Sequence, residues 1–573
     1  MTSVTPLIGP NMLTWPQIRS MRLPTCFPVL LLPSMLFCQV MQPLAIPPLL
    51  EQDTMHLTVA AHTHQFYPGI NTPTYGVNGP YLGPTLVLHR GDTARIVVEN
   101  QLSEITTMHW HGMHVPGEMD GGPHSIIEPG ASWMAEYPVK NPAGTYWYHP
   151  HPHLLTAKQA NRGVAGFLIV RDDEEAQLDL PRTYGVDDIP LVIQDKKFTG
   201  TGEMAEYPVG DSLWVNGTPN AYLEVPAQVV RIRLLNGSIA RIFRLGFADD
   251  RSFAVIAGDG GLLPAPAATN RLMLSNGERA EVLLDLSGLE GDSLLLMSYG
   301  NELGQSMPGS GNFMFEGSLL NGIAFPVLRI RIGAPTVNPV TAIPSTLVSD
   351  PAPDESSSIR TRIKTITGTG MVAMGQFLIN GEMFDMDVVN DTMLLGSNEV
   401  WHFVNNSNLA HPMHLHGVSF FVLERNGVPP SPWERGPKDV VLVEAGEDVK
   451  VIVHFGELAG ADFPFMYHCH NLMHEDHMMM LQFVVMDPTT GMDAPLGDAV
   501  QVASSPTGGV VHYKASHSVE HITVRDVLGR MVLDRAGPFS KEGTLDLPAA
   551  AKGVLVLVLE GNGRRSVARV VKE

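Results

Sequence analysis

The stretch RGDTARIVVEN, residues 90–100, is a turn followed by alternating apolar residues and a closing Asn. Variations on this theme recur as VPAQVVRIRLLN (225–236) and LGSNEVWHFVNN (395–406). Apolar residues at every second position are typical of a β-strand with one buried face. Three copies of one pattern indicate that a single structural unit occurs three times along the chain.

A second theme lies downstream of each copy. It appears as EPGASWMAEYPV (128–139), SNGERAEVLLDL (275–286) and EAGEDVKVIVHF (444–455), and each stretch is typical of a Gly turn that opens a strand. The composition agrees, because 55 Gly and 45 Pro accompany few long stretches with the helical period. The sequence therefore predicts an all-β protein that contains three β-sandwich domains.

Length and composition support several large cores. The chain has 573 residues, of which 44% are hydrophobic and 17% are charged. Its net charge of −22 argues against a nucleic-acid or anionic-membrane partner. The predicted domains and a small additional C-terminal unit span 46–175, 185–335, 360–490 and 516–573.

The segment 1–45 is interpreted as an export-signal region. Arg19 and Arg22 precede the apolar run LPTCFPVLLLPSMLFC, which has the length of a signal peptide. We expect cleavage between Cys38 and Pro47. A single membrane anchor is the alternative, and the shortness of the run and its prolines disfavour it.

Cysteine is rare in this chain. Only Cys26, Cys38 and Cys469 occur, and there is no C-x-x-C motif of the zinc-ribbon or thioredoxin type. Once the signal is removed, Cys469 is the single cysteine left. An internal disulfide is then impossible, so this thiol must serve another purpose.

Histidines occur in pairs of the form His-x-His, in the first and third copies but not in the middle one. Residues i and i+2 of a strand face the same side, so the two imidazoles of a pair point together. Copper, iron and zinc all accept imidazole, so the pairs alone do not name a metal. Four pairs, one in each histidine cluster, are His109 and His111, His149 and His151, His414 and His416, and His468 and His470.

Cys469 narrows the choice of metal. It lies between His468 and His470, so on a strand its sulfur points to the opposite face. His474 follows five residues later and Met479 ten residues later, and His411 precedes the third pair. Two imidazoles, a thiolate and a distant thioether are the ligands of a blue-copper site. One strand is therefore predicted to join this copper to a copper cluster on its other side.

The motifs HWHG (109–112), HPHPH (149–153), HPMHLHG (411–417) and HCHNLMHEDHMMM (468–480) resemble, in order, those of the multicopper oxidase family. The chain is most similar to its bacterial cuprous oxidase and laccase branch, over about residues 45–487. The resemblance implies cupredoxin-like Greek-key domains and four copper ions. Type 1 copper would be held by His411, Cys469, His474 and Met479, type 2 copper by His109 and His414, and the type 3 pair by His111, His149, His151, His416, His468 and His470.

The function implied by this resemblance is an oxidase. A reducing substrate would lose single electrons at the type 1 copper, and dioxygen would be reduced to water by four electrons at the trinuclear cluster. Asp120 and Glu475 match acids that supply protons in the family. The middle domain would be a spacer and packing partner.

The reductant is expected to be Cu(I) or a small phenolic or aromatic compound. Asp439 matches an acid next to a type 1 histidine, and with Met383 or Met386 and Asp385 it would form a Cu(I) substrate site. Thioethers prefer Cu(I), and the chain has 29 Met. The alternative is that these methionines fill gaps in the core. The long Met/His-rich insert of cuprous oxidases is missing here, which leaves ordinary laccase activity open.

Two other functions are alternatives to an oxidase. One is a copper-binding electron-transfer or copper-storage cupredoxin protein without oxidase turnover, which the complete set of eight cluster histidines disfavours. The other is a family member that has lost its metals, as in some division-associated relatives. Those relatives lack the cysteine and several histidines, all of which this chain retains.

The C-terminal segment HITVRDVLGRMVL and its continuation (521–573) resemble the sorting domain of the type IX secretion system. Matches include Asp526, Gly529 and Arg530, while Leu555 replaces the usual tyrosine. The resemblance implies the type IX machinery as a partner and a secreted or cell-surface protein, otherwise a periplasmic one. A β module of another role is the alternative. We expect the protein to act as a monomer.

Overall fold

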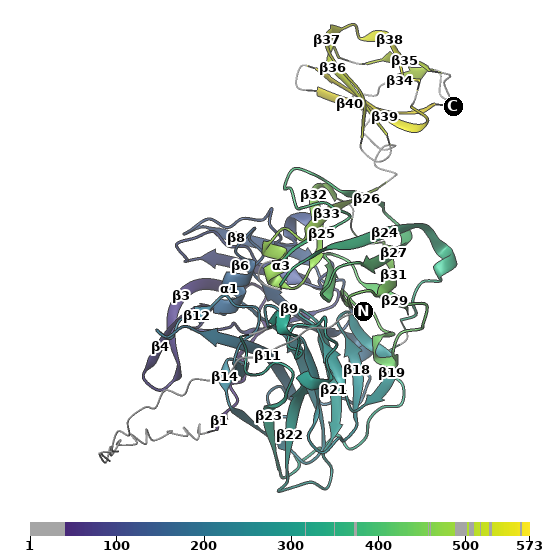
Figure 1. The fold of residues 1–573 in the computed structure, drawn as a ribbon. Helices are drawn as coiled ribbons and strands as arrows, with labels where there is room; N and C mark the ends of the chain where they lie inside the picture. Colours follow the sequence, from purple (N-terminus) through teal and green to yellow (C-terminus); the bar gives the residue numbers. More distant parts are fainter. Residues whose placement is uncertain are drawn as a thin grey trace, which may run out of the picture. The chain divides into compact units, whose positions relative to one another are not determined.

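The computed structural model describes residues 41–315, 317–348, 350–371, 375–456, 458, 460–487, 501–503, 509–515, 517–526, 530–549, 551–561 and 564–572. The export-signal prediction falls on a segment that, up to residue 40, lies outside the described residues. Strands dominate the ribbon and the helices are short (Figure 1). The expectation of an all-β fold is confirmed.

The first unit is a pair of sheets around one apolar core. Its strands alternate between buried and exposed residues, as β6 shows. One sheet has the order β2 (Leu49–Leu50), β5 (Thr85–His89), β10 (Gly166–Arg171), β9 (Gly144–His149) and β7 (His109–His111). The other has the order β4 (Ile70–Val77), β3 (Met55–Tyr67), β6 (Thr93–Asn100) and β8 (Ser132–Pro138).

The middle unit has the largest sheets and a core of its own. One sheet has the order β1 (Gln42–Pro43), β15 (Ala221–Pro226), β23 (Ala324–Gly333), β22 (Ser293–Tyr299), β17 (Phe243–Phe247) and β20 (Leu272–Leu274). The other has the order β14 (Thr218–Pro219), β13 (Ser212–Val215), β11 (Asp188–Phe198), β16 (Val229–Asn236), β21 (Arg279–Asp285), β18 (Phe253–Gly258) and β19 (Gly261–Thr269), with β12 (Met204–Ala205) paired to β11.

The third unit again consists of two sheets and one core. One sheet has the order β25 (Gln376–Ile379), β24 (Ser358–Thr369), β27 (Ser397–Asn405), β31 (Asp448–Phe455) and β29 (Phe420–Arg425). The other has the order β26 (Asp391–Leu394), β33 (Met480–Met486), β32 (Gly460–Cys469), β28 (His411–Leu415) and β30 (Val440–Val443).

The α-helices of the described residues are short. They are α1 (Thr156–Arg162), α2 (Asp173–Ala176) and α3 (Leu472–Asp476).

The two repeated sequence themes pair with each other in every unit. The strand of the first theme runs antiparallel to the strand of the second as β6 with β8, β16 with β21, and β27 with β31. The closing Asn of the first theme is buried and donates two hydrogen bonds to backbone carbonyls, at 2.8–3.0 Å, in each unit. These residues, Asn100, Asn236 and Asn405, tie the strand end to the loop that follows.

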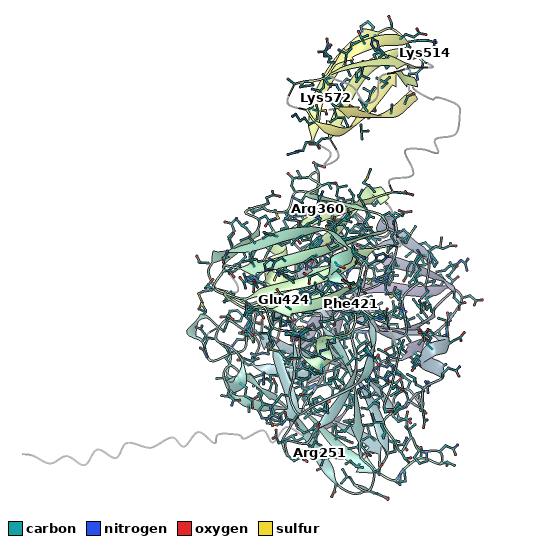
Figure 2. All side chains as sticks on the ribbon, turned by 90° about the vertical axis from the view of Figure 1, so that its right-hand side faces the viewer. Arg251, Arg360, Phe421, Glu424, Lys514 and Lys572 are labelled. Carbon is teal, nitrogen blue, oxygen red and sulfur yellow. The ribbon has the colours of Figure 1, made fainter. Side chains whose placement is uncertain are left out.

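The C-terminal module begins earlier than predicted. Its sheets have the orders β34 (Gln501–Ala503), β35 (Val510–Lys514), β38 (Glu542–Asp546), and β37 (Met531–Phe539), β36 (Val519–Asp526), β39 (Gly553–Gly561), β40 (Arg564–Lys572). Lys514 and Lys572 mark this module in Figure 2. The first two strands lie before residue 516. β35 alternates exposed and buried residues over only 5 positions, which is too brief to stand out in the sequence.

Candidate metal centre

Two antiparallel strand pairs position the histidines. In the first unit β7 pairs with β9, so that His109 lies opposite His149. In the third unit β28 pairs with β32, so that His414 lies opposite His468. Each pair of strands therefore presents its imidazoles on one side.

The repeat explains why the middle unit has no such site. In the first and third units a His-x-His pair begins nine residues after the closing Asn, at His109 and His414. The corresponding positions of the middle unit are Leu245 and Phe247, on β17, and both pack into its apolar core. The same scaffold position therefore carries either a pair of histidines or apolar core side chains.

All eight imidazoles are buried, with at most 1% of each residue exposed. His111 Nδ1 lies 3.3 Å from His149 Nε2 and 3.2 Å from His470 Nε2. His468 Nε2 lies 3.2 Å from His151 Nε2 and 3.1 Å from His416 Nε2. Imidazole nitrogens that share one ion at about 2 Å stand roughly 3.0–3.4 Å apart.

The remaining two imidazoles, of His109 and His414, lie face to face with this group. The His109 ring stacks on His416 and the His414 ring stacks on His111, both at 3.8 Å between centroids. Their Nε2 atoms are buried, and among the described residues they have no hydrogen-bond partner. Buried polar atoms without partners are rare, so these two nitrogens fit a metal ligand role.

Hydrogen bonds set which ring nitrogen is available. One nitrogen of each of five rings donates to an oxygen at 2.8–3.0 Å, which leaves the other nitrogen to face the cluster. The five rings are those of His109, His111, His149, His414 and His416. Burial, together with neighbouring imidazoles, lowers the pKa of His111, His149, His414 and His416 and thus favours the neutral form that binds metals.

The thiol of Cys469 lies on the opposite face of β32. Its Sγ is 3.5 Å from His411 Nδ1 and 3.6 Å from His474 Nδ1, and all three residues are fully buried. Met479 is buried beside them, since Cys469 N donates to the Met479 carbonyl at 3.1 Å. Burial raises the pKa of the Cys469 thiol, so a bound metal ion would have to displace its proton.

Two carboxylates contact the imidazoles from outside the cluster. Asp120 Oδ2 accepts a hydrogen bond from His416 Nδ1 at 2.8 Å. Glu475 lies between His151 and His468, with its oxygens 3.4 and 3.2 Å from their Nδ1 atoms. Burial alone raises the pKa of Glu475, but these imidazoles outweigh it and the pKa falls to about 2.

Asp439 is not where the sequence led us to expect it. It is fully buried, it accepts from His111 Nε2 at 3.0 Å, and it is paired with Arg279 at 2.6 Å. Asp439 therefore lies next to the cluster of eight imidazoles and not next to His411. The prediction of a Cu(I) substrate site containing Asp439 is therefore wrong. Asp439 directly precedes β30, and residue spacing did not reveal that its side chain is buried beside His111.

Two residues that were not predicted from the sequence contact the imidazoles of the Cys469 site. Phe377 lies against both imidazoles, with ring centroids 4.8 Å from His411 and 4.5 Å from His474. Ser407 lies 2.8 Å from His411 Nε2. Neither residue carries a sequence signal that marks it. Met383 is 43% exposed and its sulfur accepts from Gln376 Nε2 at 3.0 Å.

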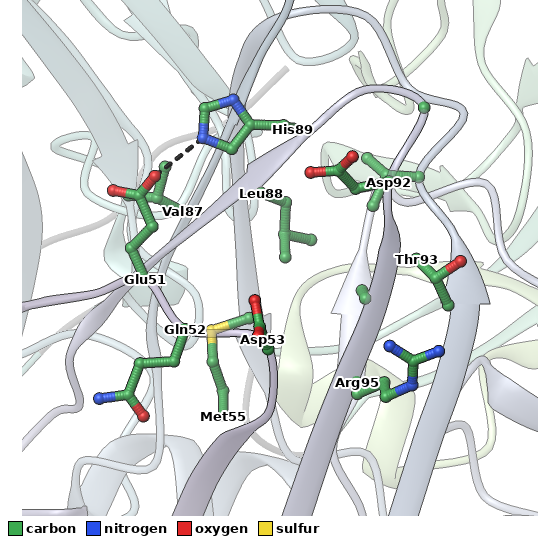
Figure 3. Close-up of a pocket in the computed structure, with 13 residues that line it drawn as sticks. Glu51, Gln52, Asp53, Met55, Val87, Leu88, His89, Asp92, Thr93 and Arg95 are labelled. Atoms are coloured by element: carbon green, nitrogen blue, oxygen red, sulfur yellow. Dashed lines mark hydrogen bonds and ion pairs between the residues drawn. The ribbon is translucent and has the colours of Figure 1, made fainter.

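The surface pocket in Figure 3 is separate from the histidine cluster and from the Cys469 site. It has a volume of about 670 Å³ and lies on the first unit, where His89 is bonded to Glu51. None of the cluster histidines lines it. Among the described residues, no helix is long and apolar enough to cross a membrane.

Comparisons with known proteins agree with this geometry. Models of the multicopper oxidase family match residues 58–175 and 355–489. The cell division proteins FtsP of Salmonella typhimurium strain LT2 and of Escherichia coli K12 are each 34% identical over 457 residues, which is 78% of this chain and 93% of each relative.

Solved structures of oxidases are similar over the same share of the chain. A laccase-like multicopper oxidase, CueO, from the lignin-degrading Ochrobactrum sp. is 36% identical with a TM-score of 0.70, covering 78% of this chain and all of that one. The McoA multicopper oxidase of Aquifex aeolicus is 31% identical with a TM-score of 0.69, covering 78% and 99%. The cupredoxin-like architecture is thereby confirmed. This chain belongs to the multicopper oxidase family.

Proposed function

We propose that this protein is a copper-dependent oxidase that transfers electrons from a small reductant to dioxygen and releases water. Family membership implies copper binding. We assign type 1 copper to the Cys469 site and three further copper ions to the eight imidazoles, as the resemblance implies. The observation that supports this most is the convergence of eight buried imidazoles from two units, six of which form two groups of three with nitrogens 3.1–3.3 Å apart.

Bound copper would supply the one-electron redox chemistry and the place where dioxygen is reduced. The chain supplies a short covalent path between the two sites, because Cys469 and its neighbours His468 and His470 are consecutive residues. Burial excludes bulk water from both sites. The path is direct: electrons that reach the Cys469 sulfur need to pass only one peptide bond to either imidazole residue.

Dioxygen reduction also consumes protons, and in the proposed function two acids deliver them. Asp120 Oδ1 is buried and has no hydrogen-bond partner among the described residues, although Oδ2 is bonded to His416. Glu475 contacts two imidazoles of the cluster. In the proposed function each carboxylate holds an imidazole in place and passes protons toward the reacting oxygen.

For the reductant we propose Cu(I) or a small phenolic compound. The ring of Phe377 covers both imidazoles of the Cys469 site. Met371 and Met383 are 40% and 43% exposed, and thioethers are ligands that suit Cu(I). Turnover of Cu(I) and of a methoxyphenol, with and without added Cu(II), distinguishes the two. Fast Cu(I) oxidation and phenol oxidation that requires added Cu(II) indicate a cuprous oxidase.

The name of the FtsP relatives favours a second candidate, a division-associated role without oxidase turnover. Oxygen uptake by the copper-loaded protein with either reductant decides between them. A blue protein that consumes dioxygen is an oxidase. A protein that binds no copper contradicts the oxidase proposal and supports the second candidate. A protein that binds copper and consumes no dioxygen also contradicts the oxidase proposal, and supports an electron-transfer or copper-storage role.

We also propose that the protein is exported and that its C-terminal module addresses it to type IX secretion. The module is a self-contained pair of sheets with its own core. Expression of the full chain in a type IX-competent host, with and without residues 501–573, tests this. The full chain should reach the medium or the cell surface, and the shortened chain should stay in the periplasm.

A further inference from the structure

The Gly turn of the second sequence theme occurs once in each unit. Gly130, Gly277 and Gly446 each precede the strand by two residues, and all have left-handed backbone with φ of 78°, 79° and 77°. The space around Gly130 and Gly446 is open for a methyl group. Gly277 of the middle unit differs, since it is buried.

Gly277 lies directly against an imidazole of the cluster. A Cβ atom at this position would be 2.9–3.0 Å from three atoms of the His470 ring. That ring is held from its other sides by His111, His149 and Trp147, with centroids 4.8–5.6 Å away. The backbone of the middle unit therefore forms one wall of the pocket that holds His470.

Two residues later, Arg279 is also buried and uses all five of its N–H groups. Nε donates to the Thr145 carbonyl at 3.1 Å, in the first unit. Nη1 and Nη2 donate to the carbonyls of Gly277 and Asp259, in the middle unit, at 3.0 and 2.7 Å. The same two nitrogens bind both oxygens of Asp439, in the third unit, at 2.7 and 2.6 Å.

Asp439 extends this network to the cluster. Its Oδ1 accepts the hydrogen bond from His111 Nε2, which leaves His111 Nδ1 to face His149 and His470. An outer carboxylate that fixes the tautomer and orientation of a ligating imidazole is a common device of metal sites. Here the carboxylate is held by a guanidinium, and the bidentate geometry is one that lysine does not reproduce.

We propose that the turn Ser275–Arg279 of the middle unit is a positioning element for the copper position formed by His111, His149 and His470. Gly277 sets the place of the His470 ring, and Arg279 acts through Asp439 on the His111 ring. The middle unit is then more than the spacer expected from the sequence, because all three units meet at this one position. The inference rests on the proposed function, since it presupposes copper at the cluster.

The test compares Arg279→Met with Arg231→Met in the full chain. Arg231 is an equally buried arginine of the middle unit, bonded to Glu175 and Glu281 but to none of the cluster residues. Copper per chain, the affinity for copper in competition with a chelator, the visible spectrum and electron paramagnetic resonance are measured for both variants and the parent. Loss of an outer hydrogen-bond partner typically weakens metal binding by about 10- to 100-fold.

We expect Arg279→Met to bind cluster copper about 10- to 100-fold more weakly, with the blue absorption of the Cys469 site unchanged. Arg231→Met should keep the affinity and spectra of the parent, even if both variants unfold more easily. If the two variants bind copper alike, the inference is wrong. If the parent itself binds no copper at the cluster, the proposed function fails instead.

A second variant covers the case in which Arg279→Met does not fold. Asp439→Asn has almost the same shape but lacks the negative charge that Arg279 and the His111 N–H share. It should show the same selective loss of cluster copper. Parent-like cluster copper in folded Asp439→Asn overturns the link between Arg279 and His111.

Discussion

The contact between Gly277 and His470 leads to a quantitative prediction for Gly277→Ala. The new methyl carbon would begin 2.9 Å from the ring, whereas carbon atoms normally approach to about 3.5 Å. The ring or the turn must therefore move by about 0.5 Å. A displacement of about this size is the tolerance within which a binding constellation functions.

The loss of folding stability expected for Gly277→Ala has two parts, which control variants can separate. An alanine in left-handed backbone costs about 1–2 kcal/mol, and this part is shared with Gly130→Ala and Gly446→Ala because their φ angles are nearly equal. Overpacking against the ring adds about 1–3 kcal/mol. We therefore expect Gly277→Ala to lose about 2–5 kcal/mol of stability when the copper-free protein is unfolded, and each control about 1–2 kcal/mol.

Copper retention during dialysis against a chelator is the decisive assay. Gly277→Ala should release cluster copper faster than the parent, while both controls retain it. The blue band of the Cys469 site should persist in all three variants. If Gly277→Ala retains copper as the controls do, the turn does not set the position of His470 and the reasoning is refuted.

Four further predictions concern other parts of the molecule. Cys469→Ser should abolish the blue colour and turnover, and metal analysis should show the loss of about one copper per chain, because the eight imidazoles are separate from the thiolate. Loss of all copper would contradict the existence of two independent copper sites. Glu475→Gln should slow dioxygen reduction but not reduction of the blue site by the donor, measured by stopped flow, and equal slowing of both would argue against proton delivery. Phe377→Ala should destabilise the fold by about 3–5 kcal/mol. It should also oxidise bulky phenols faster than Phe377→Leu, because the ring covers both imidazoles of the Cys469 site. Unchanged phenol kinetics would show that donors approach elsewhere. Lys196 is fully buried, and burial lowers its pKa to about 7. The charged ammonium therefore destabilises the folded state below this pH, and the destabilisation fades as the pH rises toward 10.5. Relative to Lys196→Met, the parent should gain at most about 4 kcal/mol of stability between pH 7 and 10 in denaturant titrations, and a pH-independent difference would contradict the shift.

Much of the site was predictable because the residues within each motif lie close together in the sequence. Strand alternation places His468 and His470 on one side and Cys469 on the other, and the structure has this arrangement. The repeated themes likewise predicted which strands are related, and they pair with each other in all three units. Local periodicity is sufficient for such inferences because it depends on only a few residues of backbone.

The sequence by itself determined the strands, the repeat and the types of side chain that a copper site needs. Only the tertiary structure decided which residues surround those side chains: Asp439 lies beside His111 rather than His411, and Gly277 and Arg279 of the middle unit reach the cluster. These contacts join residues more than a hundred positions apart. They arise where three units, each with a core of its own, pack together, and no local pattern of polar and apolar residues encodes how those surfaces meet.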